Sequence, residues 1–283
     1  MNEATLKTRL HQLAEQDAPP AAAELPALLE AMMQFIGSVD PELRDSLIYP
    51  TFATWIESGL LAEDVLRRLF LQAVDEEHLY CGLDEAEGDR VFTRTFSLLL
   101  LPLILAVHRE TPFLPPEEIQ QVKERVLAYL PLEQDRRGYV PEKGWAHAAA
   151  HCADVLDDLA LCAELGPGDL RAILGLAAAT VAEPRFVYTH DEQERMSIAA
   201  FAVLSRQVLS QNEVKEWLDG LAAAANQHQA MLDRFYCRLN LKQFVTSLYF
   251  RLNKPANRYR LTPEWRDFMQ TSLLTTMALL SPY

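Results

Sequence analysis

Apolar residues recur every three or four positions through most of this 283-residue chain, which is the spacing of amphipathic helices. Alternation of apolar and polar residues, the mark of a half-buried strand, is nearly absent. The periodic segments run roughly from Asp45 to Ser58, Thr93 to Val107, Trp145 to Glu164, Asp191 to Val208 and Phe235 to Leu252. The pattern therefore predicts an all-α fold.

A short turn-like motif follows each periodic segment and predicts the start of a second helix. The motifs begin at Leu61, Leu114, Leu165, Leu209 and Leu261, and successive leucines are 53, 51, 44 and 52 residues apart. Ser210 with Glu213 has the spacing of a capping box, and Pro263 after Thr262 suits a first helical turn. We expect an α-solenoid of about five stacked helical hairpins (HEAT-like), with one or two extra N-terminal helices between Thr5 and Gly37.

Prolines and glycines divide the chain without breaking it into domains. Pro19-Pro20 ends the first helix, and the segment Ser38 to Pro41 separates the N-terminal helices from the first hairpin. No low-complexity segment or interdomain linker follows. The sequence predicts a single helical-repeat domain over residues 1–283.

Composition indicates a soluble protein with an acidic surface. Hydrophobic residues make up 49% of the chain and the net charge is −14. Lys and Arg number 13 against 25 Asp and Glu before His151, and 13 against 15 from there on. The N-terminus lacks the apolar segment of a secretory signal, and the apolar run from Ser97 to Val107 is about half a membrane span. We expect a cytoplasmic protein that does not enter a membrane, with cysteines as reduced thiols rather than zinc ligands in pairs.

The stretch from Gly138 to Leu159 contains the residues best suited to chemistry. On an ideal helix, His147, His151, Asp154 and Asp158 lie within about 60° of one another. His147, His151 and Asp154 would then offer three ligands to zinc or another divalent metal. The alternative is that both histidines are hydrogen-bonded at a helix-packing seam.

Four blocks of sequence carry a resemblance to a known family. They are Arg44 to Tyr49, Val91 to Ser97, Gly138 to His151, and Asp191 to Arg195. In this order they resemble the bacterial family of domains of unknown function numbered 2785. Cys152 departs from the expected pattern, in which glycine is frequent, and puts a close backbone approach there in doubt. The resemblance implies no activity.

Stacked hairpins would bring the polar starts of successive helices into one groove. The predicted ligand-binding residues are Arg94, Ser97, Tyr139, Trp145, His147, His151, Glu194 and Arg195. Such a groove suits a peptide, a protein segment or a small anionic ligand. The same polar residues could instead pair with one another and set the stacking register. A metal-dependent hydrolase using His147, His151 and Asp154 is the alternative function.

The C-terminal region is the basic exception in an acidic chain. Arg234, Arg238 and Lys242 are interleaved there with aromatic residues such as Phe235 and Phe244. Aromatic residues at helical spacing are usually core, and the net charge opposes binding to phosphates, so we do not expect a nucleic-acid partner. Contact between this basic end and the acidic half of a second copy would give weak homo-association. No GxSxG or phosphate-loop motif is present.

Overall fold

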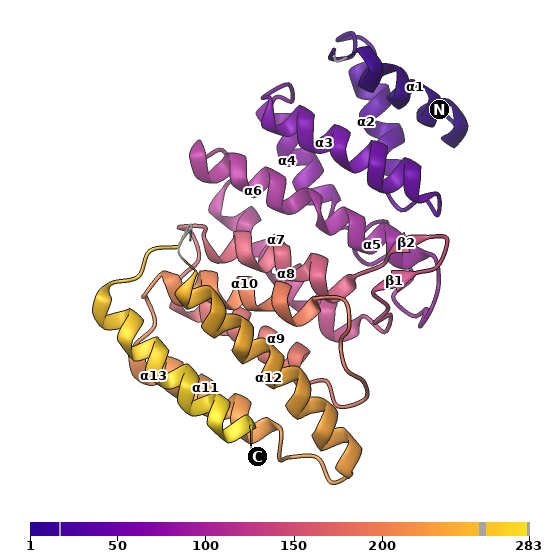
Figure 1. Ribbon diagram of the computed structural model, residues 1–283. Helices are drawn as coiled ribbons and strands as arrows, with labels where there is room; N and C mark the ends of the chain where they lie inside the picture. Colours follow the sequence, from indigo (N-terminus) through magenta and orange to yellow (C-terminus); the bar gives the residue numbers. More distant parts are fainter. Residues whose placement is uncertain (17, 255–258, 282–283) are drawn as a thin grey trace. The chain divides into compact units, whose positions relative to one another are not determined.

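The computed structural model describes residues 1–16, 18–254 and 259–281, and their regular secondary structure is almost entirely helical (Figure 1). Among them, the only strands are β1 (Tyr139–Val140) and β2 (Gly144–Trp145), which form an antiparallel pair. The predicted all-α class is confirmed. The chain divides into two compact units, Met1–Cys152 and Ala153–Tyr283, with the boundary inside helix α8 (Ala148–Ala160). The single domain stays a prediction.

The first unit consists of consecutive helices packed side by side. Its helices before the strands are α1 (Glu3–Gln16), α2 (Leu25–Gln34), the π-helix η1 (Glu42–Ile48), α3 (Tyr49–Glu57), α4 (Glu63–Gln72), α5 (Arg90–Leu98), α6 (Leu100–Glu110) and α7 (Pro116–Leu132). Helix α1 contacts η1, α3 contacts α6, and α4 contacts α6 and α7. If α1 with α2, η1 and α3 with α4, and α5 and α6 with α7 are taken as successive helical pairs, each pair packs against the pair that follows it.

The core of the first unit includes the point where α5 continues into α6. Leu98, Leu100, Leu101 and Ile104 are fully buried. The segment Arg90–Glu110 is long and apolar enough to cross a membrane by length and composition, but 67% of its apolar window is buried inside the protein. A core helix of a soluble domain passes the same test, so this segment reads as core.

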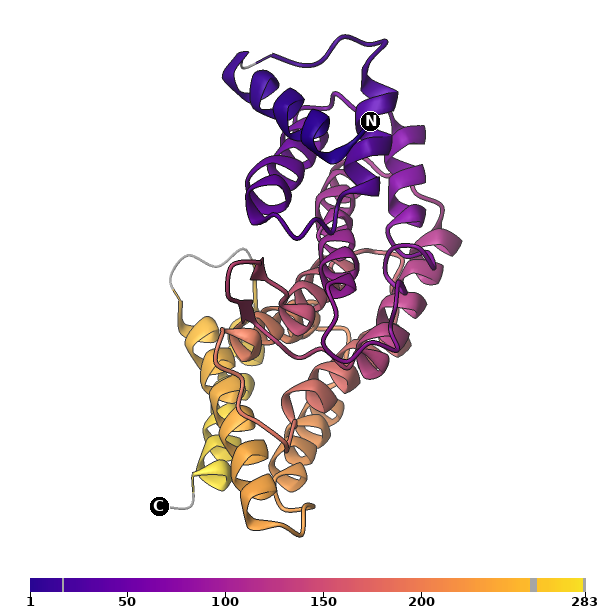
Figure 2. The same cartoon turned by 90° about the vertical axis from the view of Figure 1, so that its right-hand side faces the viewer.

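The second unit repeats this arrangement with helices α9 (Pro167–Val181), α10 (Glu192–Ser205), α11 (Gln211–Ala224), α12 (Met231–Asn253) and α13 (Pro263–Leu280). Helix α10 contacts α9 and α12, and α13 contacts α11 and α12. Figure 2 shows α12 and α13, in gold and yellow, lying side by side. Trp217 and Trp265 join neighbouring pairs, since each indole Nε1 donates to a backbone carbonyl, of Leu174 and Leu204 respectively, at 3.0 Å.

The predicted second helices are confirmed to within a few residues, because local capping sets their starts. Ser210 Oγ accepts from the backbone N–H of Glu213 at 3.3 Å, and the Glu213 carboxylate accepts from the N–H of Ser210 at 2.8 Å. Thr262 Oγ1 accepts from the N–H of Trp265 at 3.3 Å.

The four cysteines are free thiols, and burial raises the pKa of Cys237 to about 11.

One predicted helix start is wrong. The helix expected from Trp145 begins at Ala148, because Gly144–Trp145 pair as a strand and His147 has a left-handed φ of 49°. The segment predicted from Asp191 matches α10 to within one residue, although no side chain caps its start. Asp191 precedes α10 with φ 65°, and the Glu192 carboxylate accepts from the backbone N–H of His190 at 2.9 Å.

Candidate functional site

The hairpin formed by β1 and β2 presents two aromatic rings. Tyr139 lies directly opposite Trp145, and their ring centroids are 5.0 Å apart in an edge-to-face arrangement. The chain then turns sharply into α8: the N–H of His147 donates to the carbonyl of Arg137 at 3.1 Å. Glu142 in the turn and His147 after it both have positive φ, of 65° and 49°. Two non-glycine residues in this conformation mark a backbone that surrounding contacts hold in place.

Arg44 fastens the hairpin to the rest of the first unit. Its side chain is fully buried, and it donates to the carbonyls of Lys143 and Ser38, each at 2.5 Å. The guanidinium lies over the rings of Phe92 and Phe96, at 4.2 and 4.7 Å from their centroids. Burial lowers the pKa of Arg44, although Asp45 beside it opposes this effect. A buried cation that bonds one carbonyl in the hairpin and one outside it ties the two segments together.

Gly144 permits this close approach. Its φ is 83°, and an added Cβ would lie 2.8 Å from Nη2 of Arg44 and 2.9 Å from Oδ2 of Asp45. The sequence could not reveal this contact, because Arg44 and Gly144 are 100 positions apart. The hairpin therefore depends on a glycine for both its turn and its support.

Five rings continue from the hairpin into the core, and we call them the hairpin aromatic cluster: Tyr139, Trp145, His147, His151 and Phe96. Trp145 stacks on His147 at 4.4 Å between centroids, His147 meets His151 at 5.8 Å, and Phe96 meets His151 at 5.4 Å. Tyr139 and Trp145 are 50% and 39% exposed, whereas His147 and His151 are 8% and 6% exposed. The cluster thus has an open outer face on a sealed base.

His151 is also held by the core, since its Nδ1 lies 3.2 Å from the carbonyl oxygen of Thr95.

In the second unit, the Asp154 carboxylate accepts from Arg195 Nε at 2.7 Å, and burial raises the pKa of Asp154 despite this partner. Among the described residues, no group of three or more His, Cys, Asp or Glu side chains is placed to hold a metal ion. The metal hypothesis for His147, His151 and Asp154 gains no support from this geometry.

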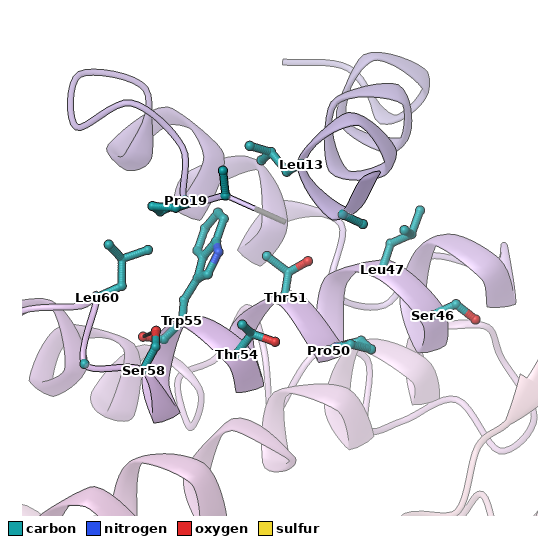
Figure 3. Close-up of a pocket in the computed structure, with 13 residues that line it drawn as sticks. Leu13, Pro19, Ser46, Leu47, Pro50, Thr51, Thr54, Trp55, Ser58 and Leu60 are labelled. Carbon is teal, nitrogen blue, oxygen red and sulfur yellow. Dashed lines mark hydrogen bonds between the residues drawn. The ribbon is translucent and has the colours of Figure 1, made fainter. Parts of the chain in front are cut away.

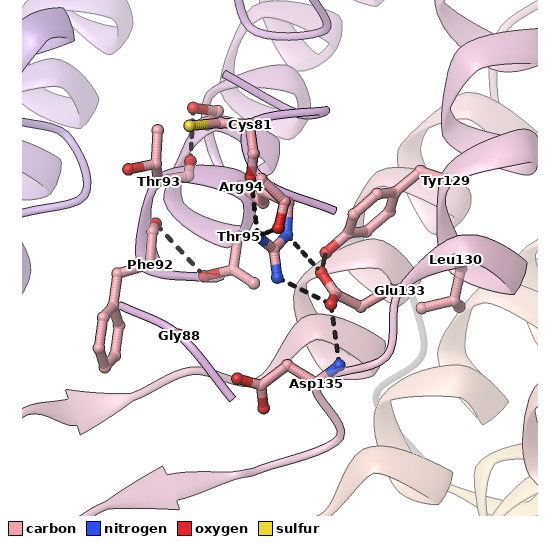
Figure 4. A network of polar contacts seen from close by, with 12 residues as sticks. Cys81, Gly88, Phe92, Thr93, Arg94, Thr95, Tyr129, Leu130, Glu133 and Asp135 are labelled. Carbon is pink, nitrogen blue, oxygen red and sulfur yellow. Dashed lines mark hydrogen bonds and ion pairs between the residues drawn. The ribbon is translucent and has the colours of Figure 1, made fainter. Parts of the chain in front are cut away.

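Arg94 and Ser97, two of the predicted ligand-binding residues, lie in the core. Arg94 donates from Nε and Nη2 to the two carboxylate oxygens of Glu133 at 2.6 and 2.8 Å, and Tyr129 donates to the same carboxylate at 2.6 Å (Figure 4). Nη1 of Arg94 donates to the carbonyl of Cys81 at 2.8 Å. Burial opposes the charge on Arg94, but the bonds to Glu133 raise its pKa. Ser97 Oγ donates to the carbonyl of Thr93 at 2.7 Å. These contacts favour the packing role over a ligand-binding role for both residues.

Glu194 and Arg195 belong to the second unit and pair with other helices there. Arg195 binds Asp154, while Glu194 accepts from Arg251, whose Nε donates to Ser197 Oγ at 2.9 Å. Glu194 also lines a cavity of about 640 Å³, together with polar side chains that include Thr189, Asp191, Gln193, Lys242, Gln243 and Thr246. Of the residues predicted for the groove, the structure brings Tyr139, Trp145, His147 and His151 together.

Glu133 and Asn240 are buried polar residues that sequence reasoning missed. Glu133 carries the charge that balances Arg94, but nothing in its local sequence distinguishes it from a surface acid. Asn240 is fully buried, and its Nδ2 donates to the carbonyls of Glu183 and Phe186 at 3.0 and 2.9 Å. An asparagine between leucines on the apolar face of a helix was the available signal.

The fold and these contacts define an all-α protein of packed helical pairs that presents an aromatic hairpin. A family model described as "Protein of unknown function (DUF2785)" matches residues 79–250, which is more than half of the chain. The chain belongs to this family, as the resemblance of its sequence blocks indicated. No curated protein and no solved structure matches the chain. The matched residues include the hairpin, Arg94 with Glu133, and Asn240.

Proposed function

We propose that this protein is an α-solenoid of the HEAT-like kind that binds a peptide segment of a partner protein through the hairpin aromatic cluster. The packing within each unit supports the solenoid: α3 contacts α6 in the first unit, and α10 contacts α12 in the second. Contact between equivalent helices of successive pairs is how solenoids bury the apolar faces that a single pair cannot bury alone.

The observation that carries the binding proposal is the exposed face of Tyr139 and Trp145 on a braced base. Tyrosine and tryptophan are enriched among the residues that contribute most to binding, because they offer large apolar area and a polar tip. Here Arg44 holds the hairpin backbone at Lys143 and His147 stacks on Trp145, so binding would cost little further ordering of the Trp145 ring. A surface arranged in this way suits a partner that lays apolar side chains across the rings.

The charge around the cluster favours a neutral or basic peptide over a small anion. The first unit contains 25 acidic residues against 13 Lys and Arg. The nearby cations have partners, since Arg44 is buried and Lys143 Nζ binds Asp89 at 2.7 Å. In the cavity of about 640 Å³ in the second unit, Asp191 and Glu194 accompany Lys242, so its charges do not select an anion either.

Selection from a random peptide library on the full-length protein tests this proposal. We expect enriched peptides whose affinity falls tenfold or more in Trp145→Ala, which corresponds to the loss of a binding hot spot of about 1.4 kcal/mol or more. Phe250→Ala is the matched control, because Phe250 is 61% exposed and lies in the second unit. Failure to enrich any peptide, or equal affinities for both variants and the wild type, would rule out this surface as the binding site.

A further inference from the structure

A mostly apolar cleft in the first unit lies between the end of α1 and the outer face of α3. It has a volume of about 630 Å³. Leu13, Pro19, Leu47, Pro50 and Leu60 form its walls, and Figure 3 shows them around a common space. This volume falls within the range of about 300 to 1,000 Å³ that is usual for small-molecule sites.

Trp55 supplies an unused hydrogen-bond donor to this cleft. The residue is 6% exposed, and none of the described residues accepts a hydrogen bond from its indole Nε1. In Figure 3 the indole stands up from α3, and its nitrogen faces the space between Leu13 and Thr51. Trp217 and Trp265 differ, because each indole N–H donates to a carbonyl at 3.0 Å. Trp55 Nε1 is not among the buried polar atoms that lack a partner, so solvent reaches it, and a ligand in the cleft would replace that contact with its own acceptor.

The chemistry of the lining limits what could supply this acceptor. None of the lining residues that the structure describes carries a charge. A carboxylate would enter such a site without a cation to balance it, which is unfavourable. The hydroxyls of Thr51 and Thr54 lie on the same face of α3 as Trp55 and line the same cleft, so a second weak polar contact is within reach.

We propose that this cleft binds a neutral, mainly apolar small molecule that carries a carbonyl group. The carbonyl oxygen accepts the hydrogen bond from Nε1 of Trp55, and the apolar body packs against Leu13, Leu47 and Pro50. The site is separate from the hairpin aromatic cluster and uses none of its residues.

Three compounds of similar shape test the carbonyl hydrogen bond and the preference for a neutral ligand separately: butyrophenone, butylbenzene and 4-phenylbutyrate. Each is titrated into the full-length protein while the indole N–H resonances are followed by NMR, with the Trp55 signal assigned from Trp55→Phe. We expect butyrophenone to move the Trp55 indole proton downfield and to leave those of Trp217 and Trp265 in place. Butylbenzene should bind more weakly and without the downfield shift, and 4-phenylbutyrate should bind most weakly.

Two variants provide the controls. Trp55→Phe keeps an aromatic ring but removes the donor, so we expect it to weaken butyrophenone about tenfold by calorimetry and butylbenzene less than twofold. Ala14→Phe places a ring at the exposed rim of the cleft and should weaken both compounds, whereas Ala163→Phe at an exposed site in the second unit should weaken neither. The proposal is overturned if no compound moves the Trp55 signal, if 4-phenylbutyrate binds as tightly as butyrophenone, or if Trp55→Phe affects both neutral compounds equally.

Discussion

The guanidinium of Arg94 in α5 and the carboxylate of Glu133 after α7 form a two-pronged ion pair that is closed to solvent. The side chains are 1% and 0% exposed, and the two N···O distances are 2.6 and 2.8 Å. The hydroxyl of Tyr129 and the backbone N–H of Asp135 complete the bonding of the carboxylate. The pair joins two helices whose sequences give no hint of their proximity.

Removing one partner of this pair should destabilise the fold strongly. In Arg94→Met the Glu133 carboxylate stays buried without its cation, and we expect a loss of about 3 to 5 kcal/mol in the free energy of unfolding. The double variant Arg94→Met/Glu133→Leu leaves no buried charge, so it should lose less. Urea denaturation followed by circular dichroism measures both. Lys215→Met, which breaks an exposed pair with Asp219, should change stability by about 0.5 kcal/mol or less. A similar small loss in Arg94→Met would contradict the structural role.

Alanine substitutions at Gly59 and Gly144 allow the cost of a left-handed backbone to be measured apart from the cost of a steric clash in the hairpin. Gly59 and Gly144 have φ of 72° and 83°, but an added Cβ meets nothing within 4 Å at Gly59 and meets Arg44 at 2.8 Å at Gly144. Gly59→Ala should therefore cost only the left-handed conformation, about 1 to 2 kcal/mol. Gly144→Ala should cost about 1 to 3 kcal/mol more, because Arg44 has no room to move. Equal shifts in chemical denaturation would show that Arg44 does not brace the hairpin.

Asp154 should make stability depend on pH in a defined direction. Burial raises its pKa, so the folded protein holds the proton more tightly than the unfolded chain does. Its stabilising contribution is full below the ordinary aspartate pKa of about 3.9 and is lost as pH rises through the raised value. Asparagine does not titrate, so the stability of Asp154→Asn does not include this pH-dependent loss. The melting temperature of Asp154→Asn relative to the wild type should therefore rise between about pH 4 and pH 7, and that of the exposed control Asp219→Asn should not. A falling difference for Asp154→Asn would show that pairing with Arg195 outweighs burial.

The helical pairs were predictable because their signals are local. Capping at Ser210 and Thr262, and prolines at Pro116, Pro167 and Pro263, set helix starts within a few residues of sequence. The strand pair was not predictable in the same way. Its conformation depends on Arg44, which reaches Lys143 across 99 positions, and the apolar spacing after Trp145 continued a helical pattern through His147.

The structure brings together only some of the residues predicted for the groove, and the reason is physical. A charged residue at a helix start looks the same in sequence whether it faces solvent or a buried partner. Arg94 has such a partner in Glu133, 39 positions further along, whereas Tyr139 and Trp145 are 50% and 39% exposed. Burial depends on contacts distant in sequence, so aromatic and basic residues could be named as candidates but not sorted into core and surface.

The four tryptophans are divided evenly, with Trp55 and Trp145 in the first unit and Trp217 and Trp265 in the second. A variant that retains the two tryptophans of one unit and carries phenylalanine in place of the other two emits from that unit alone. Indole emission then reports the melting of each half of the polypeptide by itself, and superposition or separation of the two curves says whether this chain is one cooperative folding block or two.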